Sequence, residues 1–288
     1  MKKKSKILVT GSNGQLGKCI RDLVESYPNY NFHFRNSKEL NVTKKDQIES
    51  LFLKEDYDYC INCAAYTAVD KAELEEDKAY LVNAEAVKYL AETCKENSCV
   101  LIHISTDFVF DGTKSIPYTE NDTSNPVNIY GASKLKGEKY IRAILSNYFI
   151  IRTSWVYSKY GNNFVKTMLQ LGRERDEISV VNDQVGTPTY AGDLGKVILS
   201  IIKKESCAFG VYHYSNEGVA SWFDLAKEIF ESRKANVKVN SIPTSEYPTA
   251  AKRPTYSVLD KSKIKNNLDV EISYWRDSLK IILEENYK

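Results

Sequence analysis

Residues 7–17, ILVTGSNGQLG, decide the fold class of this chain. The short apolar run Ile7–Thr10 reads as a strand, three glycines follow at positions 11, 14 and 17, and a helical pattern begins at Leu16. This GxxGxxG spacing lets the chain turn tightly, approach a pyrophosphate and pack a helix close to a strand. The first N–H groups of that helix have no partner inside the helix and can bind phosphate oxygens. The segment therefore predicts a dinucleotide-binding turn, with a plain turn as the alternative.

Outward from this segment, short apolar runs alternate with helical patterns through the first half of the chain. The near-continuous apolar run Cys99–Ser105 is typical of a parallel sheet covered on both faces. The predicted strands are Ile7–Thr10, Asn31–Arg35, Tyr59–Ala64, Cys99–Ser105 and Phe149–Trp155, and the predicted helices are Leu16–Ser26, Asp46–Phe52 and Ala79–Asn97. This alternation predicts an α/β fold with a doubly wound parallel sheet, a Rossmann domain.

The alternation of short apolar runs with helical patterns ends after Val156. Turn-rich segments such as NDQVGTPTYAGD separate the helices there, and one helix is predicted to begin at an N-cap, Ser221. We predict a cofactor-binding Rossmann domain over residues 1–156, which also uses part of residues 190–212. A smaller α/β domain over residues 157–288 is predicted to bind mainly the substrate.

The bulk composition narrows the class of protein. The chain has 288 residues, of which 42% are hydrophobic and 27% charged, with a formal net charge of +2. This balance is ordinary for a globular protein and argues against a general electrostatic grip on nucleic acid. The basic start Met1–Lys4 is followed by too short an apolar run for a signal peptide, and no run approaches the ~20 residues of a membrane span. We therefore expect a soluble, cytoplasmic protein that binds neither nucleic acid nor membrane.

The six cysteines and three histidines show no metal-binding spacing. Cys60 and Cys63 form a CxxC, but residues i and i+3 of a strand point to opposite faces about 10 Å apart, beyond the reach of a disulfide. No second CxxC or paired histidine completes a zinc site. We interpret the cysteines as structural, and likewise the histidines at 33, 103 and 213, which lie in strand-like apolar contexts.

The second predicted strand ends in Arg35, at a position where an acidic residue would hold the ribose 2′-OH of NAD. A guanidinium suits a 2′-phosphate instead, because its donors match phosphate oxygens. We predict NADPH as the cofactor, with NADH left open; a solvated surface arginine is the alternative.

A tyrosine and a lysine are spaced i, i+4 in the segment NIYGASKLKGE, residues 128–138. On a helix Tyr130 and Lys134 share a face. An ammonium beside a phenol favours the phenolate, so we expect Lys134 to lower the phenol pKa and to contact the nicotinamide ribose. Thr106 ends a predicted sheet strand, where such folds place their ligands, and can hydrogen-bond a substrate oxygen. The alternative is an ordinary surface pair on a helix.

With these motifs in place, the chain resembles the extended short-chain dehydrogenase/reductases, in the branch that reduces dTDP-linked 4-keto sugars. The resemblance covers nearly the whole chain, through GSNGQLG, CAAYTAVDKAE, STDFVFDG, YGASKLKGE, RTSWVY, DQVGTPTY and RPTYSVLD. It implies reduction of the C4 keto group of dTDP-4-dehydro-β-L-rhamnose to dTDP-β-L-rhamnose by hydride transfer from NAD(P)H, in nucleotide-sugar and cell-surface polysaccharide biosynthesis.

The resemblance also implies site residues. The catalytic residues would be Thr106, Tyr130 and Lys134. The residues expected at the cofactor are Gly11, Asn13, Gly14, Gln15, Leu16, Gly17, Arg35, Asn41, Val42, Ala64, Ala65, Tyr66, Thr67, Tyr130 and Lys134. Those expected at the sugar nucleotide are Thr106, Asp107, Trp155 and Arg253.

Some positions depart from the family pattern or allow a second interpretation. Asn41 stands where the family commonly has Asp, and its amide is expected to accept a hydrogen bond from adenine without charge. Phe108 replaces a tyrosine and lacks its hydroxyl. Trp155 could be a core residue, and Arg253, whose guanidinium suits a diphosphate, could lie in a surface loop. Some relatives form dimers around magnesium; we predict no metal here and a monomer or homodimer.

Three other activities remain on the same fold. A dehydratase needs a further acid/base after the threonine-aspartate pair, and Phe108 cannot move a proton, so the sequence disfavours dehydration. An epimerase would keep its nicotinamide through turnover. A non-catalytic regulatory subunit, like the family's partner of methionine adenosyltransferase, would not turn over at all. The sequence leaves these last two open, together with reductases for related nucleotide 4-keto-6-deoxysugars.

Overall fold

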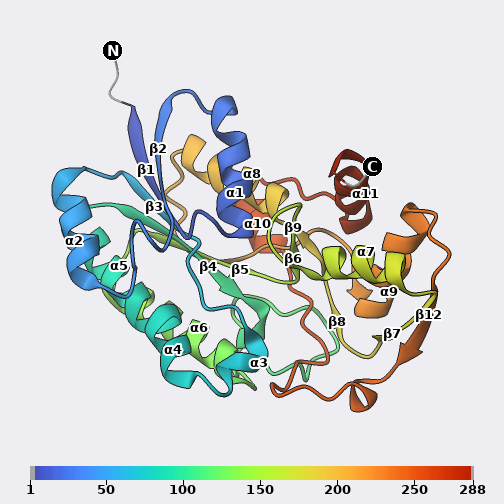
Figure 1. Cartoon of the computed structure of the whole chain (residues 1–288). Coiled ribbons are helices and arrows are strands. Elements are labelled where there is room, and N and C mark those ends of the chain that lie inside the picture. Colours follow the sequence, from blue (N-terminus) through green and yellow to red (C-terminus); the bar gives the residue numbers. More distant parts are fainter. Residues whose placement is uncertain (1–3, 287–288) are drawn as a thin grey trace.

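The computed structural model describes residues 4–286 as a layered α/β molecule with a smaller lobe at one end (Figure 1). Its centre is a six-stranded parallel sheet in the order β10-β5-β4-β3-β1-β2. The strands are β1 (Ser5–Thr10), β2 (Tyr30–Arg35), β3 (Tyr59–Asn62), β4 (Val100–Thr106), β5 (Tyr148–Thr153) and β10 (Gly210–His213). The predicted doubly wound parallel sheet is confirmed.

Helices cover both faces of this sheet, as Figure 1 shows. On one face α1 (Gln15–Leu23), α8 (Ala191–Lys203) and α10 (Ser262–Leu268) pack on Ile7, Val9 and the neighbouring strands. On the other, α2 (Lys45–Lys54), α5 (Ala86–Glu96) and α6 (Ile129–Ile144) pack on Leu8, Leu101 and Ile150. Alternate residues of each strand thus enter opposite cores, which is why these strands read as continuous apolar runs.

The smaller lobe is built from short paired strands and three helices. Its strand pairs are β7 (Glu177–Val181) with β12 (Lys238–Ile242), β6 (Val156–Tyr157) with β9 (Thr189–Tyr190), and β8 (Val185–Gly186) with β11 (Ala220–Ser221). The helices α7 (Phe164–Glu174), α9 (Trp222–Ser232) and α11 (Trp275–Asn286) enclose a core that includes Phe230 and Trp275. Ser221 caps α9 as predicted, and Asp224 returns a hydrogen bond in a capping box.

Several predicted boundaries differ from the structure. The first predicted helix is α1 followed by a 3₁₀ turn, η1 (Val24–Ser26). The strand predicted to reach Ala64 ends at Asn62, where its pairing with β1 ends. The helix predicted over Ala79–Asn97 is three pieces, α4 (Glu76–Tyr80), the π-helical turn η2 (Leu81–Glu85) and α5. Its apolar stripe continues across η2, so the sequence pattern does not reveal the interruption.

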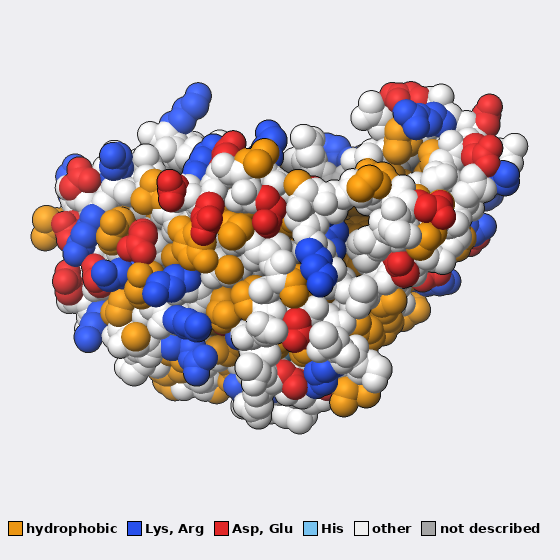
Figure 2. Space-filling view, turned by 90° about the horizontal axis from the view of Figure 1, so that it is seen from below, with side chains coloured by type: hydrophobic (Ala, Val, Ile, Leu, Met, Phe, Trp, Pro, Cys, Tyr) orange, Lys and Arg blue, Asp and Glu red, His pale blue; other side chains and the backbone are white. Residues whose placement is uncertain are grey.

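Three short elements complete the described chain: α3 (Val69–Ala72), η3 (Asp107–Val109) and η4 (Thr244–Glu246). Within residues 4–286, every helix is too short or too polar to cross a bilayer. Figure 2 shows basic and acidic side chains mixed over the face seen from below, without a field of one sign.

Candidate active site

The glycine turn between β1 and α1 is shaped for close approach. Gly11 has φ +61°, and a Cβ there would lie 2.5 Å from the backbone nitrogen of Ala64. The Gly14 N–H bonds the Gly11 carbonyl at 2.9 Å, and no side chain caps the α1 N-terminus. The buried Ser12 hydroxyl has no partner among the described residues. A cradle of backbone N–H groups and one unpaired hydroxyl is chemically suited to phosphate oxygens, so these residues fit a dinucleotide.

Gly17 lets α1 pack directly on the turn. A Cβ at Gly17 would lie 2.7 Å from the Ser12 Cα atom. Because Ser12 Cα is a backbone atom, the clash could be relieved only by a shift of the main chain. We expect Gly17→Ala to lower the free energy of unfolding by about 1–3 kcal/mol through overpacking, despite the helix-favouring methyl. Gly195→Ala in α8 is the matched control, because its nearest neighbour is a Leu23 methyl at 3.3 Å. Denaturant unfolding of both variants measures the difference; equal stability of the two would contradict the close approach.

Gln15 ties the first turn of α1 to the smaller lobe. Its side-chain oxygen accepts hydrogen bonds from Ser158 Oγ at 3.0 Å and Asn163 Nδ2 at 2.8 Å. The side chain of Gln15 is therefore occupied, and its backbone N–H is the group left for a cofactor. Leu16 lies in the core, and Asn13 is exposed beside the turn.

The expected adenosine end is only partly assembled. Arg35 lies at the end of β2, where its carbonyl accepts from the Ser12 N–H at 3.2 Å. Its guanidinium donates one hydrogen bond to the Phe34 carbonyl at 3.2 Å, which leaves its other N–H donors for a phosphate. The expected acceptor role of Asn41 does not fit, because its side-chain oxygen already accepts from the Thr43 N–H and hydroxyl. Val42 is 8% exposed and packs in the core, which leaves only its backbone for the cofactor.

The segment Ala64–Thr67 runs from β3 along the glycine turn and is held by Asn83, a residue that the sequence analysis missed. Asn83 lies in the π-helical turn η2 and is fully buried. Its side-chain oxygen accepts from the Tyr66 N–H at 2.8 Å, and its amide donates to the Tyr66 carbonyl and to Ser133 Oγ, both at 3.0 Å. Asn83 thereby fixes the 64–67 segment relative to α6. Only the π-helical turn, which the apolar pattern does not reveal, identifies this role.

The start of α6 is fixed against β4 by its cap and by a glycine. The Asn128 side chain accepts from the Gly131 N–H at 2.8 Å and donates to the Lys252 carbonyl at 2.8 Å. A Cβ at Gly131 would lie 2.1 Å from the Phe108 carbonyl oxygen, so only glycine permits this approach. The close contact brings Tyr130 beside the end of β4.

Tyr130, Thr106 and Asp107 form one polar cluster at the carboxyl edge of the sheet. The Thr106 hydroxyl donates to Asp107 Oδ1 at 3.0 Å and is also a hydrogen-bond partner of the Tyr130 phenol. Burial raises the pKa of Tyr130 to about 12, with the Asp107 charge adding to the shift and the Thr106 contact opposing it. Burial also raises the pKa of Asp107 to about 6, and its Oδ2 atom has no partner among the described residues. The phenol is protonated at neutral pH, as a phenol with the ordinary pKa near ~10 would also be.

Lys134 does not act on the phenol as predicted. Its Nζ atom donates to the Ile104 carbonyl at 2.6 Å and contacts His103 Nε2 at 3.2 Å. Burial lowers the pKa of Lys134 to about 8. The expectation that this ammonium lowers the pKa of Tyr130 is wrong for this arrangement, because desolvation dominates both groups and the lysine is turned toward β4. His103, which the sequence analysis interpreted as structural, is therefore a direct polar neighbour of Lys134.

Of the expected substrate residues, only Arg253 lines a cavity of about 510 Å³, whose walls come mostly from the smaller lobe; Thr106, Asp107 and Trp155 do not line it. Trp155, with φ +47°, stacks on Trp222 at 3.6 Å between ring centroids, and Trp222 lines the cavity. Arg253 also lines it but is paired with Asp70, through contacts of 3.0 and 2.7 Å. The sequence analysis identified neither Trp222 nor Asp70 as a site residue, because their contacts join segments distant in the chain.

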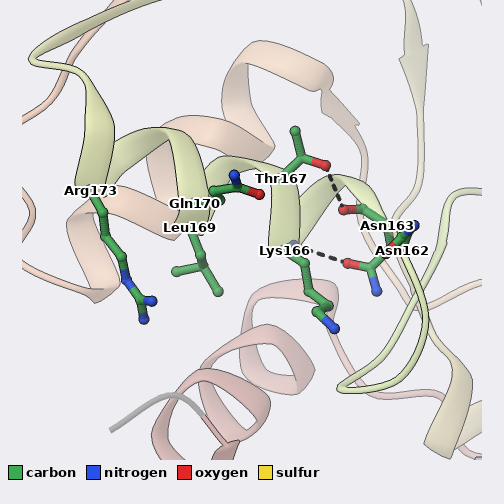
Figure 3. A pocket seen from close by; sticks show the side chains of 7 residues that line it. All are labelled: Asn162, Asn163, Lys166, Thr167, Leu169, Gln170 and Arg173. Atoms are coloured by element: carbon green, nitrogen blue, oxygen red, sulfur yellow. Dashed lines mark hydrogen bonds between the residues drawn. The ribbon is translucent and has the colours of Figure 1, made fainter.

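A second cavity of about 570 Å³ runs along α7 and is lined by Asn162, Asn163, Lys166, Thr167, Leu169, Gln170 and Arg173 (Figure 3). None of the predicted catalytic or cofactor residues reaches it. Throughout residues 4–286, acidic, histidine and cysteine side chains nowhere gather in a set of three suited to a metal ion. All six cysteines, Cys60 and Cys63 included, are free thiols in the structure.

Comparison with known proteins gives a consistent family. Residues 5–288 match the family model described as the RmlD substrate binding domain. The chain is 42% identical to a dTDP-4-dehydrorhamnose reductase of Aggregatibacter actinomycetemcomitans, over 96% of this chain and 98% of the relative. It is 38% identical to the Salmonella typhimurium dTDP-4-dehydrorhamnose reductase, over 98% of each chain.

The solved structures agree. A crystal structure of dTDP-4-dehydrorhamnose reductase from Bacillus anthracis in complex with NADP superposes with a TM-score of 0.95 at 41% identity, covering 98% of this chain and 99% of that one. A UDP-glucose 4-epimerase of Thermus thermophilus reaches a TM-score of 0.84 at 16% identity, which shows a shared fold alone.

Proposed function

The chain belongs to the dTDP-4-dehydrorhamnose reductase family, and from that premise we propose how its residues carry out the reaction. The enzyme is an NADPH-dependent oxidoreductase that reduces the C4 keto group of dTDP-4-dehydrorhamnose in dTDP-rhamnose biosynthesis. The observation that carries the assignment of roles is the polar cluster of Thr106, Asp107 and Tyr130 at the carboxyl end of β4. NADPH, when bound, supplies the hydride to C4.

In this proposal Tyr130 is the general acid. A phenol is protonated at neutral pH, which is the state needed to donate a proton to the C4 oxygen, and the raised pKa of Tyr130 leaves that state unchanged. Thr106 orients that oxygen and then hydrogen-bonds the phenolate that remains. Asp107, whose Oδ2 atom lacks a protein partner, accepts from a sugar hydroxyl. Lys134 reaches the nicotinamide ribose once it leaves the carbonyl of Ile104.

The cofactor cradle in this proposal is largely main chain. The backbone of residues 11–16, with Gly17 allowing close packing, surrounds the pyrophosphate, and Ala64, Ala65, Tyr66 and Thr67 lie along the dinucleotide. The 64–67 segment keeps its place through Asn83. The adenosine end rests on Arg35 and on the backbone of Asn41 and Val42.

We expect Arg35→Ala to weaken NADPH binding roughly 10- to 100-fold and NADH binding little. A charge-assisted hydrogen bond to the 2′-phosphate is worth about 1.5–3 kcal/mol, and NADH lacks that group. Fluorescence titration of both cofactors against the same variant measures the difference, so NADH is the internal control. Equal weakening of both cofactors would make Arg35 a surface arginine.

The nucleotide end of the substrate is proposed to occupy the cavity lined by Trp222. Aromatic faces there suit a pyrimidine base, and the guanidinium of Arg253 suits the diphosphate. Arg253 already makes a bidentate pair with Asp70, so the diphosphate must compete with a carboxylate or approach the remaining donors. In this proposal Trp155 acts through Trp222, because its ring stacks on the Trp222 ring.

An assay of purified protein separates this proposal from the two other activities. Steady oxidation of NADPH that depends on dTDP-4-dehydrorhamnose, with dTDP-rhamnose as the product by NMR, is expected. A 4-epimerase would interconvert sugars without net NADPH oxidation. A regulatory subunit would bind NADPH without turnover. A related 4-keto sugar nucleotide turned over faster would change the substrate assignment.

The remaining parts of the proposal concern the whole protein. We propose a cytoplasmic enzyme that acts as a monomer or homodimer. The division into a cofactor domain over residues 1–156, with part of 190–212, and a substrate domain over residues 157–288 is supported by β10 joining the central sheet.

A further inference from the structure

A line of buried polar side chains runs beneath the active site from β1 to α6. Thr10 Oγ1 donates to Asn62 Oδ1 at 2.6 Å, and the Asn62 amide nitrogen lies 3.0 Å from His103 Nδ1. His103 Nε2 lies 3.2 Å from Lys134 Nζ. All four side chains are at most 2% exposed, so water does not substitute for these contacts.

A backbone N–H sets the direction of the hydrogen bonds along this line. The Ala64 N–H donates to Asn62 Oδ1 at 3.2 Å, and a backbone N–H can only donate. Asn62 therefore turns its oxygen toward Ala64 and its NH₂ group toward His103. Since that NH₂ group is also a donor, His103 Nδ1 must accept. A neutral His103 then carries its proton on Nε2, the nitrogen that faces Lys134.

The Nε2–H tautomer distinguishes the two forms of Lys134. A neutral amine accepts from Nε2–H with its lone pair and donates to the Ile104 carbonyl, which is the geometry observed. An ammonium has three N–H donors and no lone pair, so it would oppose Nε2–H donor to donor. The charged lysine must leave His103, or the imidazole must give up its contact with Asn62.

The other groups around Lys134 allow it to change between the amine and the ammonium. Glu138, one turn along α6, and Cys63, after β3, both favour the ammonium, but burial outweighs them and lowers the pKa of Lys134 to about 8. Glu138 is itself engaged by Arg152 and Ser105. Burial and the nearby lysine hold the pKa of His103 well below its usual range, which keeps the imidazole neutral. Tyr130 lies one turn before Lys134 on the same face of α6.

We propose that His103, oriented by Asn62, is a positioning residue that holds Lys134 against β4 at alkaline pH, where the lysine is an uncharged amine, and that a proton taken up from solvent as the pH falls releases the lysine toward Tyr130 and the cofactor. The release step rests on the proposed role of Lys134, whereas the tautomer of His103 is a property of the free protein. The active form is the ammonium, so activity falls as pH rises through the pKa of Lys134.

Nitrogen-15 NMR of the imidazole rings in the ligand-free, full-length protein tests the tautomer. The chain has three histidines, so the spectrum is simple, and Asn62→Asp assigns His103 as the ring whose signals move. We expect the proton of wild-type His103 on Nε2 at pH values above 8. A wild-type ring protonated on Nδ1, or on both nitrogens, overturns the proposal without touching the NADPH oxidation assay.

Asn62→Asp tests the control over Lys134. A carboxylate at position 62 accepts from Nδ1–H, which moves the imidazole proton off Nε2 and leaves a lone pair for the ammonium. The pKa of Lys134 should rise, and the alkaline limb of kcat/KM should move up by about one pH unit, a tenfold change in proton affinity. Thr10→Val is the matched control. It removes the Thr10 hydroxyl that donates to Asn62 Oδ1 and leaves the Asn62 NH₂ group facing His103. The alkaline limb of kcat/KM should therefore stay at its wild-type pH. An unmoved limb in Asn62→Asp, or an equal shift in Thr10→Val, overturns the proposal.

Discussion

Tyr130→Phe is expected to lower kcat by about 100-fold or more while the affinity for NADPH stays close to that of the wild type. The phenol hydroxyl is the proposed proton donor to the C4 oxygen, and the loss of a general acid costs on the order of 10²–10⁴ in rate. Phenylalanine keeps the ring and its edge-to-face contact with Phe108, at 5.9 Å between centroids. The fold around the start of α6 should therefore be unchanged.

Tyr140→Phe is the matched control for this experiment. Tyr140 lies on the same helix, and its hydroxyl bonds Glu85 at 2.9 Å, away from the sheet edge. Its loss should leave kcat within a factor of about two, since a single hydrogen bond outside the proposed site contributes little. Steady-state rates at saturating NADPH, with cofactor titration of both variants, separate chemistry from binding. Turnover near the wild-type value in Tyr130→Phe would remove Tyr130 from the mechanism and point to Asp107 as the acid.

Glu138→Gln should lower the free energy of unfolding by about 3–5 kcal/mol, the usual cost of breaking a buried ion pair. Glu138 accepts from Arg152 at 2.9 and 2.7 Å and from Ser105 Oγ at 2.5 Å, and the carboxylate and guanidinium side chains are 0% and 3% exposed. Glutamine removes the charge and places an NH₂ donor among these donors. The Arg152 guanidinium is then left buried without its counter-ion.

Glu49→Gln provides the comparison on the surface. Glu49 pairs with Lys45 across one helical turn at 3.6 Å, with both side chains more than two-fifths exposed. Such pairs contribute about 0.3–0.5 kcal/mol, so this variant should unfold almost as the wild type does. Denaturant unfolding followed by circular dichroism measures both. A Glu138→Gln protein as stable as Glu49→Gln would show that water or backbone movement replaces the lost partner.

The structural expectation and the electrostatic expectation for Tyr130 and Lys134 had different outcomes, for one physical reason. The i, i+4 spacing correctly places Tyr130 and Lys134 on one helix, α6. It says nothing of what covers that face. Once β4 and the 64–67 segment bury it, desolvation disfavours both charged forms, raising the phenol pKa and lowering the lysine pKa. A surface pair of the same spacing would have behaved as predicted.

The sequence by itself determined the parts of this protein that depend on local pattern. The continuous apolar strands, the glycine spacing of residues 11–17 and the cap at Ser221 predict the parallel sheet, the cofactor turn and the start of α9. These follow from backbone geometry and side-chain periodicity, which act over a few residues. The family motifs predict Thr106, Tyr130 and Lys134 as the catalytic residues, by resemblance and not by local geometry.

Only the tertiary structure decided which polar groups meet. Asn83 reaches the 64–67 segment through a π-helical turn, Asp70 pairs with Arg253 across 183 positions, and Asn62 joins Thr10 to His103. Each contact joins segments distant in the chain, so no local pattern encodes it. The same burial that brings these groups together removes water from them, and it is this loss of solvation that sets their protonation states and hydrogen-bond directions.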